Sequence, residues 1–292
     1  MSPAPIAPVT RLGLQIPNFT FPGVADADLF ETIAGIATTA DSSGFDSVWV
    51  MDHLYQIEVV GPREDPMLEA YTLLGALAAR TRQVALGTMV TGVTYRNPAL
   101  LAKIVTTLDI ISSGRAILGI GAAWNDDEHA GYGYDFPTAG ERLDRLEEAL
   151  QITRAMFTEQ APTFEGRHYR VQQVLNNPKP IRGRIPVLIG GGGEKRTLRL
   201  VAQYGDACNL FGGPDEVRHK LDVLERHCAD VGRDPAEITK TILYTVRDPL
   251  AAADKVAGFT AIGVDGVVVN MPDVQDLDKV AATGEALRKV LP

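Results

Sequence analysis

Val48-Trp49-Val50-Met51-Asp52-His53 is a short apolar run that ends in an acid and an imidazole side by side. Strands of a parallel barrel end in this way, because their interiors are buried while their C-terminal tips open onto a ligand site. We therefore interpret residues 48–51 as the end of an inner strand. Asp52 and His53, which follow directly, are the first candidates for site residues.

The composition is that of an ordinary globular protein. The chain has 292 residues, of which 45% are hydrophobic and 22% are charged, and its formal net charge is -9. Two average domains would fit this length, but single α/β barrels reach roughly 250 residues or more. With no run of Lys or Arg, the acidic balance argues against a nucleic-acid binder or a membrane-surface binder.

Cysteine content and the N-terminal sequence indicate the compartment. Cys208 and Cys228 are too few for a disulfide framework or a zinc cluster, as expected in a reducing cytoplasm. No apolar run approaches the roughly 18 residues of a membrane span, and no signal-peptide pattern opens the chain. We expect a cytoplasmic protein in which residues 1–10 form a disordered tail and residues 11–292 form one domain.

Short β-rich apolar runs alternate with longer amphipathic segments from residue 11 onward, which is typical of a parallel sheet built from βα units. We predict strands at 12–16, 47–51, 84–90, 116–120, 186–189, 207–210, 239–246 and 266–269. The predicted helices are 28–43, 67–80, 98–111, 141–157, 194–204, 214–231, 251–262 and 275–290, with a small hairpin insertion at 163–174. Eight units favour a closed (β/α)8 barrel, the TIM-barrel fold, because closure leaves no edge strand. A doubly wound sheet is the alternative.

The residues just past each predicted strand are the candidates for chemistry. A carboxylate beside an imidazole, as in Asp52-His53, can fix the ring tautomer and hold the ring for proton transfer near neutral pH. The structural alternative is that Asp52 caps the next segment and His53 packs. Residues 88–94 are small, hydroxyl-bearing or β-branched, which suits a flat rim against a planar ring. A strand that overruns its end is the alternative there.

Two glycine-rich stretches follow later strands. Residues 119–121 let a ligand approach the backbone, but they lack the third glycine and the acid of a dinucleotide fingerprint. Residues 190–193 are four glycines that lead into a predicted helix, where free N–H groups together with Lys195, Arg196 and Thr197 suit a phosphate. A flexible turn is the alternative for this loop. The histidines elsewhere in the chain lack metal-ligand spacing, so we predict no metal site.

Several motifs, taken together and in this order, resemble the bacterial luciferase-like monooxygenase superfamily over residues 11–270. Members of that superfamily are (β/α)8 barrels that bind a flavin or deazaflavin at their C-terminal face. The motifs that carry the resemblance are Gly44-Phe45-Asp46-Ser47-Val48-Trp49, Tyr95-Arg96-Asn97-Pro98, Gly114-Arg115, Gly119-Ile120-Gly121, Trp124-Asn125, Glu141-Arg142-Leu143 and residues 186–192.

Within the superfamily, an Asp-His pair after the second strand resembles the branch that uses coenzyme F420, a deazaflavin. Enzymes that use flavin mononucleotide (FMN) more often carry a Glu-His-His type of ending. The resemblance implies that Asp52 and His53 contact the deazaflavin ring or its substrate, and that a non-prolyl cis peptide joins Met89 to Val90 behind the ring. The cofactor-binding residues expected on these grounds are Asp52, Met89, Val90, Thr91, Gly121, Asn125, Gly190, Gly191, Gly192 and Lys195, the last four toward the phosphate end.

One position departs from the sugar-phosphate dehydrogenases of this branch, in which an acidic residue follows the glycines after the fourth strand. Trp124 stands there, which leaves His53 as the expected proton donor or acceptor, with Asn125 and Glu128 as helpers. We predict an F420-dependent oxidoreductase that moves hydride to or from an unidentified organic small molecule. The resemblance also implies a homodimer. The alternatives are an FMN-dependent luciferase-like monooxygenase and a barrel that binds a flavin or deazaflavin without catalysis.

Overall fold

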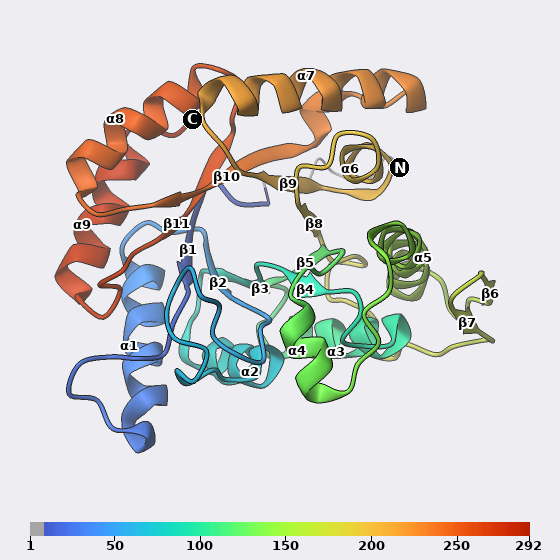
Figure 1. Ribbon diagram of the computed structural model, residues 1–292, viewed down its shortest axis with the longest axis horizontal. Coiled ribbons are helices and arrows are strands. Elements are labelled where there is room, and N and C mark those ends of the chain that lie inside the picture. Colours follow the sequence, from blue (N-terminus) through green and yellow to red (C-terminus); the bar gives the residue numbers. More distant parts are fainter. Residues whose placement is uncertain (1–8) are drawn as a thin grey trace.

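The computed structural model describes residues 9–292 as a closed ring of parallel strands surrounded by helices (Figure 1). Within these residues, eight strands follow one another around the ring in the order β3-β2-β1-β11-β10-β9-β8-β5, and β3 pairs with β5 to close it. They are β1 (Leu12–Ile16), β2 (Ser47–Val50), β3 (Ala85–Thr88), β5 (Ala116–Gly121), β8 (Val187–Gly190), β9 (Ala207–Leu210), β10 (Thr239–Thr245) and β11 (Gly266–Asn270). The predicted TIM-barrel fold is confirmed.

Helices cover the outside of the ring (Figure 1). They are α1 (Leu29–Ser42), α2 (Ala70–Arg80), α3 (Pro98–Ile111), α5 (Ala139–Thr158), α6 (Thr197–Tyr204), α7 (Pro214–Val231), α8 (Pro249–Thr260) and α9 (Leu277–Arg288). The short helix α4 (Asp126–Tyr132) lies in the loop after β5, and two 3-10 turns are η1 (Asp26–Asp28) and η2 (Pro235–Glu237). Two helices begin three residues later than predicted. The Glu69 side chain accepts from the N–H of Thr72 and so caps α2 at Ala70. Residues 194–196 form a turn, so α6 begins at Thr197.

Two further pieces lie outside the simple repeat. The predicted strand 84–90 ends at Thr88, and the two-residue β4 (Thr91–Gly92) resumes beside β5. The predicted hairpin is present as β6 (Phe164–Glu165) and β7 (Arg170–Val171), which pair antiparallel. It projects beyond α5, away from the ring (Figure 1). The interruption of the third strand therefore lies in the barrel wall, whereas the hairpin lies outside it.

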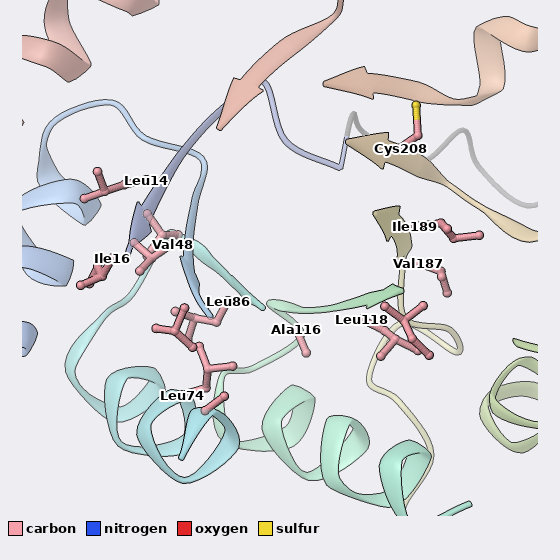
Figure 2. Close-up of a cluster of buried hydrophobic side chains, with 14 of the residues drawn as sticks. Leu14, Ile16, Val48, Leu74, Leu86, Ala116, Leu118, Val187, Ile189 and Cys208 are labelled. Carbon is pink, nitrogen blue, oxygen red and sulfur yellow. The ribbon is translucent and has the colours of Figure 1, made fainter. Parts of the chain in front are cut away.

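Strand side chains alternate between the inside of the barrel and the surrounding helices. In β2, Val48 and Val50 belong to the large outer cluster, whereas Trp49 belongs to a small inner cluster. The outer cluster includes Leu14, Leu74, Leu86, Leu118 and Ile189 (Figure 2). A Cβ at Gly13 or Gly87 would lie 2.6 or 2.8 Å from the indole of Trp49. Glycine at both positions therefore makes room for Trp49 to fill the barrel.

Most of the predicted tail, residues 1–8, lies outside the described residues. The two residues that follow are packed against the barrel. The N–H of Val9 donates to Thr239 Oγ1 at 3.2 Å, and the hydroxyls of Thr10 and Ser47 lie 2.7 Å apart. Ser47 Oγ also accepts from Nε1 of Trp49 at 2.7 Å, so the start of the described chain supports the indole that fills the barrel.

Neither a membrane-spanning helix nor a metal cluster occurs in residues 9–292. No helix in this range is both long and apolar enough to cross a membrane. The same residues contain no group of three or more His, Cys, Asp or Glu side chains placed to hold a metal ion. Cys208 and Cys228 are both buried and free, and burial raises the pKa of the Cys208 thiol to about 12.

Candidate active site

A cavity of about 300 Å³ lies at the C-terminal ends of the strands. Its lining brings together residues from separate loops: Asp52 and His53 after β2, Met89, Val90 and Thr91 around the β3–β4 break, Gly121 and Asn125 at and after β5, and Gly190, Gly191, Gly192 and Gly193 after β8. Met89, Val90 and Leu243 also pack on the inner cluster around Trp49. That cluster therefore supports an apolar floor beneath the cavity.

His53 is held by the carboxylate of Glu128, which comes from α4. His53 Nδ1 lies 2.8 Å from Glu128 Oε2, and the two side chains are 15% and 0% exposed. Glu128 also accepts from the N–H groups of Leu54 and Tyr55 and from the Tyr95 hydroxyl, the last at 2.8 Å. Burial alone would raise the pKa of Glu128, but these hydrogen bonds hold it below its ordinary value. The anion favours a proton on Nδ1 and leaves Nε2 for a ligand.

Asp52 has a different partner, so the prediction that it orients the His53 ring is wrong. The Asp52 carboxylate is buried and accepts from Arg96 at 2.6 and 3.0 Å. Arg96 also reaches Glu69 at 2.6 Å, and its guanidinium lies 4.9 Å from the centre of the Tyr71 ring. Burial raises the pKa of Asp52, and the Arg96 guanidinium opposes that rise. Asp52 is thereby fixed in the cavity wall, since a bidentate pair allows it one position.

The Met89–Val90 peptide is cis, as the family resemblance implies. The Met89 carbonyl accepts from Gln15 Nε2 at 3.4 Å, which ties this segment to β1. A Cβ at Gly121 or at Gly190 would lie 2.9 Å from the side chain of Val90. These two glycines therefore make room for Val90, in addition to lining the cavity.

The glycine loop lines the cavity, but its predicted cationic neighbours do not. Gly191 has φ of 112°, a conformation in which other residues are strained. Lys195 is exposed and is not part of the lining. Arg196 is engaged elsewhere, because it pairs with Asp144 and donates to the carbonyl of Gly140. The Gly191 N–H donates to the Asn209 carbonyl at 3.4 Å, so the loop presents the backbone of Gly192 and Gly193 and the Thr197 side chain rather than the predicted charges.

Lys220 of α7 is the cation behind the glycine loop. A Cβ at Gly192 would lie 3.0 Å from Lys220 Nζ. The ammonium donates to the Phe211 carbonyl at 3.1 Å and pairs with Glu216. Lys220 therefore lies beside the loop but outside the cavity lining, and its charge is paired with Glu216.

Comparison with known proteins agrees with this architecture. The model of the luciferase-like monooxygenase family matches residues 10–290. The chain belongs to this family. It is 33% identical over 214 residues to the F420-dependent glucose-6-phosphate dehydrogenase of Kineococcus radiotolerans, in an alignment that covers 72% of this chain and 62% of that relative. This luciferase-like chain thus spans less than two thirds of that relative's length.

Two solved structures share the fold of this luciferase-like protein. An F420-dependent secondary alcohol dehydrogenase in complex with an F420-acetone adduct has a TM-score of 0.79 at 20% identity, with 96% of this chain and 99% of that chain covered. Riboflavin lyase with modified FMN and riboflavin has a TM-score of 0.81 at 13% identity, with 97% and 92% covered. The same fold is therefore found in a barrel whose name mentions F420 and in one whose name mentions FMN.

The lining of this luciferase-like barrel fits a flavin-type ring. Asn209 is fully buried in β9, and its Nδ2 donates to Thr241 Oγ1 at 2.9 Å. Among the described residues its Oδ1 has no hydrogen-bond partner, although Asn209 lines the cavity. A buried acceptor without a donor costs about 1–3 kcal/mol, so an N–H on the edge of a bound ring would satisfy it. An apolar floor, this acceptor and the glycine loop together suit a planar ring with a phosphate-bearing tail.

Three residues have roles here that were not predicted. The sequence signal for Asn209 is a polar residue inside the otherwise apolar strand Ala207–Leu210. Glu128 was expected only as a helper, and Arg96 only as part of a family motif. Neither carries a local signal, because their contacts with His53 and Asp52 depend on how α4 and the loop before α3 pack against the end of β2.

Proposed function

We propose that this protein is a coenzyme F420-dependent oxidoreductase that transfers hydride between the deazaflavin and an organic small molecule. The observation that carries the proposal is the His53–Glu128 pair, which brings a proton-transfer group to a cavity with an apolar floor and a glycine loop. The Asp52-His53 ending and the F420-dependent relative support the deazaflavin over FMN. Assembly as a homodimer and a cytoplasmic location stay predictions from the sequence.

When bound, the deazaflavin supplies or accepts the hydride, and the residues of this chain bind it and handle the proton. Met89, Val90 and Leu243 would lie against the ring and keep water from its floor. Asn209 Oδ1 would accept from a ring N–H. The N–H groups of Gly192 and Gly193 would hold the phosphate, because neighbouring amides attract an anion, whereas the Gly191 N–H already donates to the Asn209 carbonyl at 3.4 Å.

His53 is the proposed proton donor and acceptor. Because Glu128 accepts from Nδ1, a neutral His53 presents the Nε2 lone pair to the cavity and a protonated one presents an N–H. In a reduction, His53 gives its Nε2 proton to the substrate oxygen. In an oxidation, it takes the proton of the substrate hydroxyl. Glu128 stabilises the imidazolium, as a buried carboxylate does for other catalytic histidines.

Cofactor titration tests the proposal. We expect purified protein to bind oxidised F420 at least about tenfold more tightly than FMN, a difference of about 1.4 kcal/mol. Cofactor fluorescence measures both dissociation constants. Equal or tighter binding of FMN, with oxygen consumption once the FMN is reduced, would support the luciferase-like monooxygenase alternative, which the FMN-carrying barrel favours. Binding without any substrate-dependent change in cofactor absorbance would support the non-catalytic alternative.

A pair of glycine variants tests where the cofactor tail lies. Gly191 and Gly183 have φ of 112° and 74°, so Ala is strained at both, but only Gly191 lines the cavity. We expect Gly191→Ala to weaken F420 binding at least about tenfold and Gly183→Ala to leave it unchanged. Unchanged affinity in a folded Gly191→Ala protein contradicts the phosphate role of the loop.

A further inference from the structure

The outer part of the cavity carries large apolar side chains with no covering. Trp124 and Phe211 both line the cavity, and they are 61% and 49% exposed. The Trp124 ring stands edge-on to the imidazole of His53, with ring centres 5.6 Å apart. Exposed aromatic side chains that converge on a cavity mark a ligand surface, because an apolar ligand that covers them removes that surface from water.

A row of tyrosine rings continues this surface outward from the cavity. Tyr95 lines the cavity, and its ring lies 5.8 Å from that of Tyr134. The rings of Tyr134 and Tyr132 are stacked at 6.3 Å, and Tyr132 lies 5.5 Å from Tyr55. Tyr132 and Tyr134 are exposed. The apolar surface therefore extends from His53 over α4, which is long enough for a ligand larger than one ring.

The same cavity offers no cation to an anionic substrate. Among its lining residues, all within the described chain, none is Lys or Arg. Arg96 behind the wall is bound to Asp52 and Glu69, and Lys220 behind the glycine loop is bound to Glu216. A phosphate or carboxylate beside His53 would lose its hydration without gaining a charged partner, which is unfavourable. The lining thus disfavours sugar phosphates and organic acids.

We propose that the substrate is an uncharged aryl ketone or the corresponding secondary alcohol. Its oxygen faces His53 Nε2, and its aromatic body lies on Trp124 and Phe211 and reaches toward Tyr134. This inference rests on the proposed function and names the substrate class of that site. Aromatic packing against Trp124 and Phe211 supplies the binding energy, and the missing cations exclude charged competitors.

The reaction balances with the cofactor class already proposed. In the reduction, a hydride from the reduced deazaflavin joins the carbonyl carbon as the C=O π bond opens, and the oxygen takes a proton from His53. The ketone gains two electrons and two hydrogens and becomes the alcohol, while the reduced deazaflavin would lose those two electrons as the hydride and release its N–H proton to solvent. Solvent returns the proton to His53, whose side chain is partly exposed.

Binding is tested on the protein without cofactor, so the result does not depend on F420. The chain has two tryptophans, and Trp49 is fully buried in the barrel, so a ligand in the cavity changes the emission of Trp124. The probes are methyl naphthyl ketone and naphthoate of the same ring system, neither of which carries a phosphate that could occupy the glycine loop. We expect the ketone to quench Trp124 and to bind at least about tenfold more tightly than naphthoate.

Variants assign the binding to the aromatic surface. Trp124→Ala should raise the dissociation constant of the ketone at least about tenfold, and Trp124→Phe should keep it within about threefold, both by equilibrium dialysis. Leu250→Ala is the matched control, because Leu250 is equally a large exposed apolar side chain but lies on α8 outside the cavity lining. It should leave ketone binding unchanged.

The outcomes separate this inference from the cofactor assignment. Naphthoate binding more tightly than the ketone overturns the substrate class, and so does ketone binding that Trp124→Ala leaves unchanged. F420 binding without ketone binding rejects the substrate class alone. Ketone binding through Trp124 without F420 binding rejects the proposed function and leaves the substrate surface standing.

Discussion

The two ends of this barrel each hold a cavity, and the linings differ in kind. At the N-terminal end, a cavity of about 370 Å³ lies between α5, α6 and the start of β8. Its ionic groups largely pair with one another: Arg184 with Asp206, and Arg233 with Glu237. At the C-terminal end, the cavity is smaller, at about 300 Å³, and among its described lining residues there is no Lys or Arg.

The volume of a cavity therefore does not identify a ligand site. Charges at the N-terminal end are used to hold helices to the barrel, since Arg233 also donates to the last carbonyls of α6. At the C-terminal end, a buried carboxylate orients His53, and among the described residues Asn209 Oδ1 has no donor, which is why we propose the ligand site there. Loops after the strands are free to carry such groups because the barrel itself supplies the stability.

Turnover should show the largest contrast between the two ends. With reduced F420 and methyl naphthyl ketone, we expect His53→Ala to lower kcat by about 10²–10⁴-fold, the range for loss of a proton-transfer group. The dissociation constant of F420 should change little, because His53 handles the proton rather than the tail. Arg154→Ala, in the opposite cavity, should change neither quantity. A similar loss of kcat in His53→Ala and Arg154→Ala would contradict the assignment of proton transfer to the C-terminal cavity.

Stability should show the second contrast. The Arg96 guanidinium is only 12% exposed, and Asp52→Asn leaves Glu69 as its remaining anionic partner. This substitution should therefore lower the free energy of unfolding by about 3 kcal/mol. Asp206→Asn weakens a pair whose partner Arg184 is 40% exposed, and should cost about 1 kcal/mol or less. Urea unfolding of both variants measures these values. Equal costs would mean that the two ion pairs are equally important to the fold.

The smallest effect concerns pH. The pKa of Glu128 in the folded protein lies below its ordinary value, against the effect of burial, because of its hydrogen bonds to His53, Tyr55 and Tyr95. Its contacts therefore stabilise the folded state fully above the unfolded pKa, and that contribution is lost as pH falls through the folded pKa. The difference in unfolding free energy between wild type and Glu128→Gln should shrink as pH falls from neutral toward acid.

Tyr95→Phe sharpens that measurement. It removes one donor to the Glu128 carboxylate and keeps the ring. The pKa of Glu128 should rise toward its ordinary value, so the loss of stability on acidification should end at a higher pH and be smaller in total than in wild type. A stability difference for Glu128→Gln that stays constant with pH would show that the carboxylate titrates alike in the folded and unfolded chains.

The barrel was predictable because its signals are local. Strands β1 and β9 and helices α3 and α7 have the predicted bounds, residue for residue. Pro98 and Pro214 stand at the first positions of their helices, where the missing N–H costs nothing. The break after Thr88 was predictable only through the family resemblance, since the apolar run continues through Val90 and shows no local signal.

The amino-acid sequence was enough to place Asp52, His53, the Met89–Val90 segment and the glycine loop on one face, because parallel strands in a barrel all end at the same rim. Only the tertiary structure decided their partners. Glu128 is 75 residues from His53, and Arg96 is 44 residues from Asp52. Hydrophobic periodicity and turn residues act within a few positions of the chain. Whether His53 pairs with the neighbouring Asp52 or with the distant Glu128 depends on distances that are set only when the helices pack.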